Sequence, residues 1–321
     1  MTPHVTKAAI KRGAMIALAN WQVTLIQGTA DSLLKLLLAA PILGGVFLVA
    51  LAVGADPSTL VTLGWRQMVA TTASALWSQP VVLASFLLAL AVVAIGGSLF
   101  VFLVKAGTVA ILVRSDRDTG AIEEHPLHVD MLARAARFSM EAYLESARAL
   151  FPRYARLGLM VMGVYLASGA GYVAILANET ATGGWSTTAL VTAGFAGWIT
   201  IVNLLYLLVQ IVIAADNCSV AVAAGRVAAF LRHERRHVAL VFLVVLALVV
   251  GATGASLLAM AALSLVAFVP FVGLAALPMQ LLAWLLRGLV FQYLGLTSVG
   301  AYLKLYRAFV EKTLGRLQLA L

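Results

Sequence analysis

The sequence predicts an all-α integral membrane protein with six transmembrane helices. Of its 321 residues, 63% are hydrophobic and 11% are charged, whereas about a quarter of the residues in a soluble domain carry charge. The mean hydropathy is +1.01. Six apolar runs reach the roughly 20 residues that a helix needs to cross the hydrocarbon core of a bilayer. Runs this long predict helices, because the strands of a membrane barrel are short and alternate in polarity.

The six runs follow one another along most of the chain. They cover residues 33–53, 81–104, 157–177, 189–215, 238–269 and 274–303. The second to fifth runs contain no charged residue, while the first carries Lys35 and the sixth carries Arg287 near its middle. We therefore expect three hairpins, each made of a rising and a falling helix.

Lysine and arginine are concentrated in alternate connections, which indicates the orientation of the helices. They precede the first run, separate the second from the third and the fourth from the fifth, and follow the sixth; the other connections carry only Arg66. Because basic connections stay in the cytoplasm, we expect both termini on the cytoplasmic side of the plasma (inner) membrane. This pattern also accounts for the net charge of +9. Membrane lipids and other membrane proteins are therefore the expected partners, and nucleic acid is not.

Three segments on the basic side have the spacing of apolar and charged residues that is typical of helices at the membrane interface. The clearest covers residues 131–150, and weaker ones cover residues 7–30 and 217–232. On the opposite side, Trp65 and Trp77 indicate a further interfacial helix at residues 61–77, because tryptophan favours the headgroup level. We expect these helices to lie along the two surfaces of the bilayer.

An amphipathic helix, a rising helix and a falling helix recur three times along the chain. This predicts a single membrane domain, residues 1–321, with repeats at 6–114, 127–232 and 233–310. The falling helices end in similar strings, with Lys105, Gln210 and Gln292 at corresponding positions. Internal repeats are common in transporters, where the repeat interface forms the substrate site. Repeats also occur in proteins that transport nothing, so the pattern alone does not select a function.

Two strings in the falling helices resemble a known family. One is KAGTVA, from Lys105 to Ala110, and the other is TSVGAYLKLYR, from Thr297 to Arg307. Together with the six-run layout, they look like bacterial six-helix membrane proteins related to the membrane domain of glycerophosphodiester phosphodiesterases. The resemblance spans most of the chain and implies a six-helix membrane domain. It carries over no catalytic residue, because no soluble phosphodiesterase domain is present.

The string His233-Glu234-Arg235-Arg236-His237 has the form H-E-x-x-H. On a helix, the two histidines of this motif hold zinc and the glutamate activates a water molecule. The two arginines inside the motif disfavour a dication nearby, and no third ligand stands out in the sequence. A zinc metalloprotease using His233, Glu234 and His237 is therefore the remote alternative. No other metal or cofactor motif is complete, so no cofactor is expected.

The preferred interpretation of the same region is a basic cluster at the membrane surface. Arg232, Arg235 and Arg236 directly precede the fifth run. A basic side chain near the surface contributes about 1 kcal/mol to the binding of anionic lipid. These three arginines are the candidate site for lipid headgroups.

Arg287 is the charged residue that lies deepest in a predicted span. Its distance along the helix from Pro278 places it roughly 13 Å inside the bilayer, where a charge costs at least about 2.5 kcal/mol and usually has a role. The alternative is an arginine that snorkels or bonds to polar groups of neighbouring helices. The candidate residues for a substrate- or anion-binding site are Arg287, Asn203, Gln210, Gln292 and Lys105.

Three functions follow from these features. The first is a non-enzymatic membrane protein that binds lipids or protein partners, which the amphipathic helices and the lack of a complete catalytic constellation favour. The second is a transporter or lipid-handling protein for an anionic or amphiphilic substrate, which would use Arg287. The third is the metalloprotease.

Overall fold

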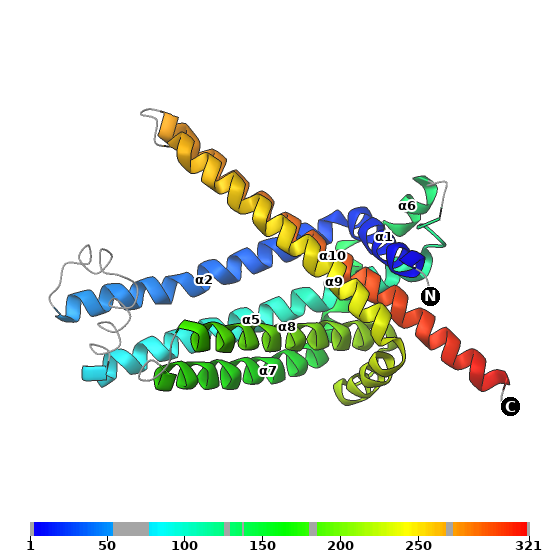
Figure 1. Ribbon diagram of the computed structural model, residues 1–321, viewed down its shortest axis with the longest axis horizontal. Coiled ribbons are helices and arrows are strands. Elements are labelled where there is room, and N and C mark those ends of the chain that lie inside the picture. The colour runs from blue at the N-terminus through cyan, green and yellow to red at the C-terminus, as the bar shows by residue number, and fades with distance from the viewer. Residues whose placement is uncertain are drawn as a thin grey trace. The chain divides into compact units, whose positions relative to one another are not determined.

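The computed structural model describes residues 3–53, 77–124, 129–136, 138–179, 185–267 and 272–319 (Figure 1). These residues form eight helices: α1 (Pro3–Ala19), α2 (Trp21–Val53), α5 (Pro80–Asp118), α6 (Val129–Ala135), α7 (Met140–Glu179), α8 (Trp185–Asp216), α9 (Val220–Ala267) and α10 (Val272–Leu319). Six of them are long and apolar enough to cross a membrane. The predicted fold class, an all-α multi-pass membrane protein, is confirmed. The interfacial helix expected at residues 61–77 lies outside the described residues, apart from Trp77.

The described residues divide into two compact units, one of which is Thr29–Phe102. Within this unit, the second part of α2 and the first part of α5 pack together through glycines. A Cβ atom on Gly97 would lie 2.4 Å from Leu34 Cδ1, and one on Gly45 would lie 2.4 Å from the Phe86 ring. Small residues at such contacts let two membrane helices approach closely.

The other unit joins Met1–Gly28 to Leu103–Leu321. Within it, α7 and α8 lie side by side, and α9 and α10 form a long hairpin (Figure 1). Helix α1 packs against α10 so closely that their backbones touch. A Cβ atom on Gly13 would lie 2.2 Å from the Thr297 carbonyl oxygen, and one on Gly300 would lie 2.6 Å from Gly13 Cα. Only glycine fits at this crossing.

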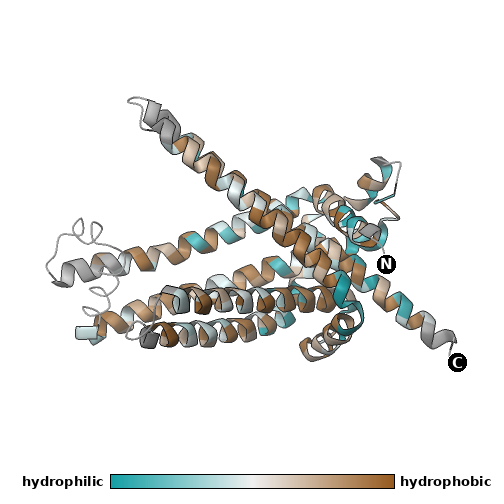
Figure 2. Cartoon of the chain, viewed as in Figure 1, coloured by the Kyte–Doolittle hydropathy of each residue, from teal (hydrophilic) through white to brown (hydrophobic). Residues whose placement is uncertain are grey.

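The protein core of this unit lies at the end of the helices that carries the charged residues. Tyr154, Ile111, Phe230 and Tyr302 are fully buried there. Along the spans, by contrast, large apolar side chains such as Leu166, Leu190, Val250 and Leu258 are exposed. Figure 2 shows hydrophobic residues along the lengths of α7 to α10. Exposed apolar side chains on a spanning helix are suited to contact with lipid.

All three amphipathic helices predicted on the basic side are wrong in their extent. The segment 131–150 is divided, because α6 ends at Ala135 and α7 begins at Met140. Ser139 starts α7 as its N-cap, since its hydroxyl accepts a hydrogen bond of 3.2 Å from the Ala142 N–H. The segment 7–30 is likewise broken at Asn20, between α1 and α2.

The third amphipathic segment, 217–232, begins later than predicted. Asn217 has a φ of 49°, a left-handed conformation that ends a helix and that asparagine tolerates. The helix therefore starts at Val220 and continues directly into the fifth span as α9. The amphipathic part and the span are one helix with a bend.

We predict that Gly13→Ala destabilises the protein. The added methyl group would meet backbone atoms of α10, which cannot move independently, and such overpacking costs about 1–3 kcal/mol in the free energy of unfolding. Thermal unfolding of the purified protein in detergent measures the effect. Gly225→Ala is the matched control, because a Cβ atom at Gly225 meets nothing within 4 Å. Equal melting temperatures for the two variants would contradict the close crossing.

Candidate functional site

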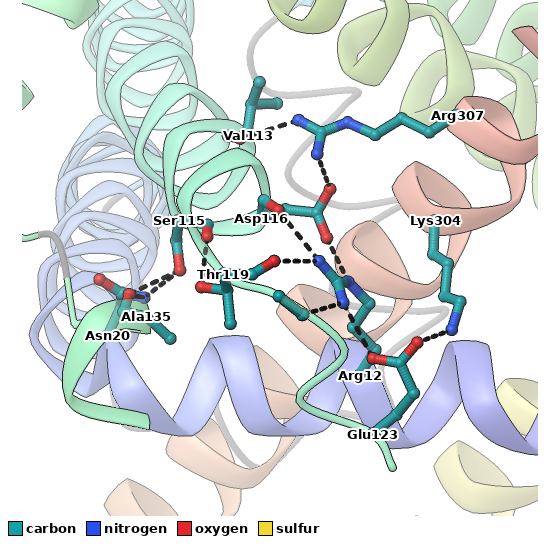
Figure 3. Close-up of polar contacts among 11 residues, drawn as sticks. Arg12, Asn20, Val113, Ser115, Asp116, Thr119, Glu123, Ala135, Lys304 and Arg307 are labelled. Carbon is teal, nitrogen blue, oxygen red and sulfur yellow. Dashed lines mark hydrogen bonds and ion pairs between the residues drawn. The ribbon is translucent and has the colours of Figure 1, made fainter. Parts of the chain in front are cut away.

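Two groups of charged side chains on the larger unit bear on its function. The first is the Arg12 cluster, which consists of Arg12, Asp116, Glu123, Lys304 and Arg307 (Figure 3). The second is the basic groove, which is lined by Ala229, Arg232, His233, Glu234, Arg235, Arg236, His237, Phe309, Lys312 and Thr313. The two places differ in burial and in the balance of charge.

Arg12 uses all five of its N–H donors at the end of α5. Its Nε donates to Asp116 Oδ1 over 2.5 Å, and its Nη1 donates to Glu123 Oε2 over 2.8 Å. The remaining donors reach backbone carbonyls of Asp116, Thr119 and Gly120, at 2.7–3.0 Å. The last carbonyls of a helix have no partner within the helix and carry partial negative charge. Arg12 therefore caps α5 from a different helix.

Two basic side chains of α10 complete the Arg12 cluster. Arg307 pairs with Asp116 and also donates to the Val113 carbonyl over 3.1 Å, and Lys304 pairs with Glu123. Asp116 has 1% of its side chain exposed, so its charge depends on these partners. The cluster thus links α1, the end of α5 and α10 (Figure 3).

A neutral hydrogen-bond network accounts for the end of α6. The Asn20 amide donates to Ser115 Oγ over 3.2 Å and to the Ala135 carbonyl over 2.9 Å. The Ser115 hydroxyl donates to the same carbonyl over 2.6 Å. Because Ala135 is held by these side chains, its carbonyl is satisfied without another turn of helix. These hydrogen bonds explain why α6 ends at Ala135, within the segment that was predicted to be one continuous helix.

The basic groove lies where α9 bends, next to the C-terminal part of α10. Glu234 has φ −115° and ψ 24°, outside the helical range, and we call this bend the α9 elbow. The groove has a volume of about 860 Å³. Figure 2 shows hydrophilic residues gathered at the elbow, beside the hydrophobic length of the span.

The groove carries more positive than negative charge. Arg232, Arg235 and Arg236 are exposed, and none of them has a hydrogen bond or an ion pair with the residues that the structure describes. Lys312 pairs with Glu234, whose Oε1 lies 3.0 Å from the Lys312 ammonium. Four cations therefore face one carboxylate. This imbalance suits an anion, and arginine in particular can bind phosphate oxygens through two N–H groups at once.

The geometry does not favour the zinc hypothesis. His237 Nδ1 lies 2.7 Å from Glu234 Oε2, and His233 Nδ1 lies 2.9 Å from the Ala229 carbonyl oxygen. The elbow between the two histidines also interrupts the regular helix on which the motif depends. In the described ranges, no group of three or more His, Cys, Asp or Glu side chains is placed to hold a metal ion.

Arg287 lies on an exposed face of α10. Its guanidinium carbon is 5.6 Å from the centroid of the Phe291 ring, within the range of a cation–π contact. It makes no hydrogen bond or ion pair with the described part of the chain. Gln292, on the same helix, packs against α2 at Gly28. The role of Arg287 in substrate binding stays a prediction.

Three other residues of that candidate site lie along α5 and α8. The Lys105 ammonium is 5.4 Å from the centroid of the Tyr206 ring, and Tyr206 lies on α8 between Asn203 and Gln210. The Asn203 amide oxygen accepts a hydrogen bond of 2.6 Å from Tyr165. Gln210 is 3% exposed. The structure thus brings Lys105 close to this stretch of α8, while Arg287 and Gln292 belong to α10.

Sequence reasoning missed the Arg12 cluster. It treated Arg12 as a marker of orientation and Arg307 as such a marker and as the end of the TSVGAYLKLYR string, and it left Asp116 and Glu123 without a role. One available signal was the placement of two acids among basic residues, directly after a span, on the side where basic residues are in excess. That signal suggests ion pairs but does not identify the partners.

We predict that Asp116→Asn strongly destabilises the protein. The amide would leave the buried Arg12 and the part-buried Arg307 beside a neutral group, and breaking a buried ion pair costs about 3–5 kcal/mol. The readout is thermal unfolding in detergent. Asp130→Asn, at an exposed position of α6, is the control and should melt like the wild type. A stable Asp116→Asn protein would show that the cluster is not needed for folding.

The stability of the protein should also depend on the charge of Glu123. Burial alone would raise the pKa of this carboxyl, but hydrogen bonds from Lys304 and Arg12 outweigh it and hold the pKa below its ordinary value. A lowered folded-state pKa contributes stability that is present at neutral pH and is lost as the pH falls below about 4. Glu123→Gln should therefore melt below the wild type at pH 7, and the difference should narrow in acid. A constant difference would contradict the pairing.

Comparisons of the chain with protein families, with curated proteins and with solved structures found no match. The resemblance to the membrane domain of glycerophosphodiester phosphodiesterases stays a prediction from the two strings quoted above.

Proposed function

We propose that this multi-pass membrane protein is non-enzymatic and binds anionic lipid through the basic groove. The observation that carries the proposal is the set of three arginines, Arg232, Arg235 and Arg236, at one groove without partners among the described residues. Exposed guanidinium groups that converge on a hollow are typical of sites for phosphate-bearing groups.

The position of the groove along α9 favours lipid over a soluble anion. The elbow is followed at once by an uncharged apolar stretch, from Val238 to Ala267, that is long enough to span a bilayer. The arginines therefore lie at the level where headgroups meet the start of a span. Each basic side chain there contributes about 1 kcal/mol to the binding of anionic lipid.

The proposal includes the inner membrane and a cytoplasmic groove. The basic residues of the connections predict that both termini and the α9 elbow face the cytoplasm. Anionic lipids give this leaflet a negative surface potential. The charge of the groove and the charge of the surface would then be complementary.

Native mass spectrometry of the full chain in detergent tests the proposal, with short-chain phosphatidylglycerol as the probe and phosphatidylcholine as the neutral comparison. The variant replaces Arg232, Arg235 and Arg236 by glutamine. Losing three cations should weaken phosphatidylglycerol binding by roughly a hundredfold. Binding of phosphatidylcholine should be weak and unchanged, because its headgroup has no net charge.

The matched control replaces three exposed arginines elsewhere, Arg134, Arg148 and Arg156, by glutamine. It removes the same net charge and should retain wild-type affinity. An equal loss in both triple variants would show that binding reflects only net charge. Wild-type affinity in the groove variant would exclude the groove as the lipid site.

A further inference from the structure

Glu234 is the one carboxylate among the side chains that line the basic groove. It contacts one side chain of α10 and one of α9. Its Oε1 accepts from the Lys312 ammonium of α10 over 3.0 Å, and its Oε2 lies 2.7 Å from His237 Nδ1 of α9. A carboxylate only accepts hydrogen bonds, so the histidine nitrogen must be the donor.

The position of Glu234 is that of an anion bound in the groove. Its side chain is 16% exposed, whereas Lys312 is 55% exposed, so the carboxylate sits deeper than the lysine that it pairs with. Its two oxygens take donors from two helices, as the oxygens of a phosphate group would. The remaining cations of the groove, the three arginines, form no ion pair with it in the described part of the chain.

The backbone at Glu234 is suited to movement of this side chain. Its φ and ψ lie outside the helical range, so Glu234 already interrupts the helix. A change at the elbow therefore disrupts less regular structure than the same change inside an intact helix would.

We infer that Glu234 is a built-in occupant of the groove, and that a phosphate-bearing lipid headgroup binds by displacing its carboxylate from Lys312. This inference rests on the proposed lipid binding and adds the ligand class and the mode of binding. The headgroup takes over the Lys312 ammonium and also engages the arginines. A phosphomonoester such as phosphatidic acid is the preferred ligand, because its higher charge competes best with a carboxylate.

Displacement would also loosen the contact between two helices. The Lys312–Glu234 pair connects the C-terminal part of α10 to the α9 elbow. When the headgroup replaces Glu234, Lys312 of α10 pairs with the ligand and no longer with α9. Lipid binding then alters how the end of α10 is held.

Zero-length crosslinking with a carbodiimide tests the displacement in the wild-type protein. The reagent joins a carboxylate and an amine in contact by an amide bond, so Glu234 and Lys312 should crosslink without lipid. Saturating short-chain phosphatidic acid should remove most of this product in a tryptic digest read by mass spectrometry, and phosphatidylcholine should not. Inorganic phosphate in place of lipid distinguishes a free anion from a headgroup, and loss of the crosslink with phosphate alone would overturn the headgroup as the ligand.

The chain provides an internal control for this experiment. Lys304 and Glu123 are a second contacting lysine–carboxylate pair, in the Arg12 cluster and outside the groove. Their crosslink should be the same with and without lipid. A fall in both crosslinks would point to consumption of the reagent or general loosening, and would count against displacement.

Glu234→Gln gives an independent measurement of affinity. The amide has nearly the same shape but no charge, so phosphatidic acid no longer competes with an anion and should bind about tenfold more tightly. Unchanged affinity would overturn the inference.

Failure of the inference can be told apart from failure of the proposed function. If the Arg232, Arg235 and Arg236 variant loses phosphatidic acid while the wild-type crosslink persists at saturation, the groove binds lipid and Glu234 is not displaced. If that variant binds like the wild type, both the lipid site and the inference are wrong.

Discussion

Arg12 connects three parts of the larger unit through one side chain. A buried guanidinium is costly unless its charge is paired and its donors are satisfied. Arg12 meets both conditions, because two carboxylates and three carbonyls at the end of α5 accept its five donors. Asp116 and Glu123 in turn bind Arg307 and Lys304 of α10. The arrangement of α1, α5 and α10 follows from these pairs.

This constraint matters because the spans have little protein around them. Lipid tails are as apolar as leucine, so no hydrophobic force drives membrane helices together. Leu166, Leu190 and Val250 remain exposed on their helices. Specific contacts at the charged end must therefore fix the helices. The contact of Gly13 with Gly300 brings α1 close to α10, and Arg12 of α1 and Arg307 of α10 both pair with Asp116 of α5.

The parts of the structure that depend on composition could be predicted from the sequence. The spans followed from run lengths, and the cluster of Arg232, Arg235 and Arg236 followed from its place before the fifth run. The breaks at Asn20 and Ser139 could not be predicted in the same way, because the amphipathic pattern continues through both. Each break depends on a side-chain hydrogen bond, and at Asn20 that bond reaches across more than a hundred residues to Ala135. The partners of Arg12 are equally distant in sequence.

The contrast between the two charged places explains why only one of them is a candidate binding site. In the Arg12 cluster, three cations meet two buried carboxylates, and every donor of the central guanidinium is used. The central guanidinium therefore has no donor left for a ligand. In the basic groove, four cations meet one carboxylate, and three guanidinium groups have no partner among the described residues. Positive charges held close together at the start of a span repel one another. An anionic headgroup at that level offsets this repulsion.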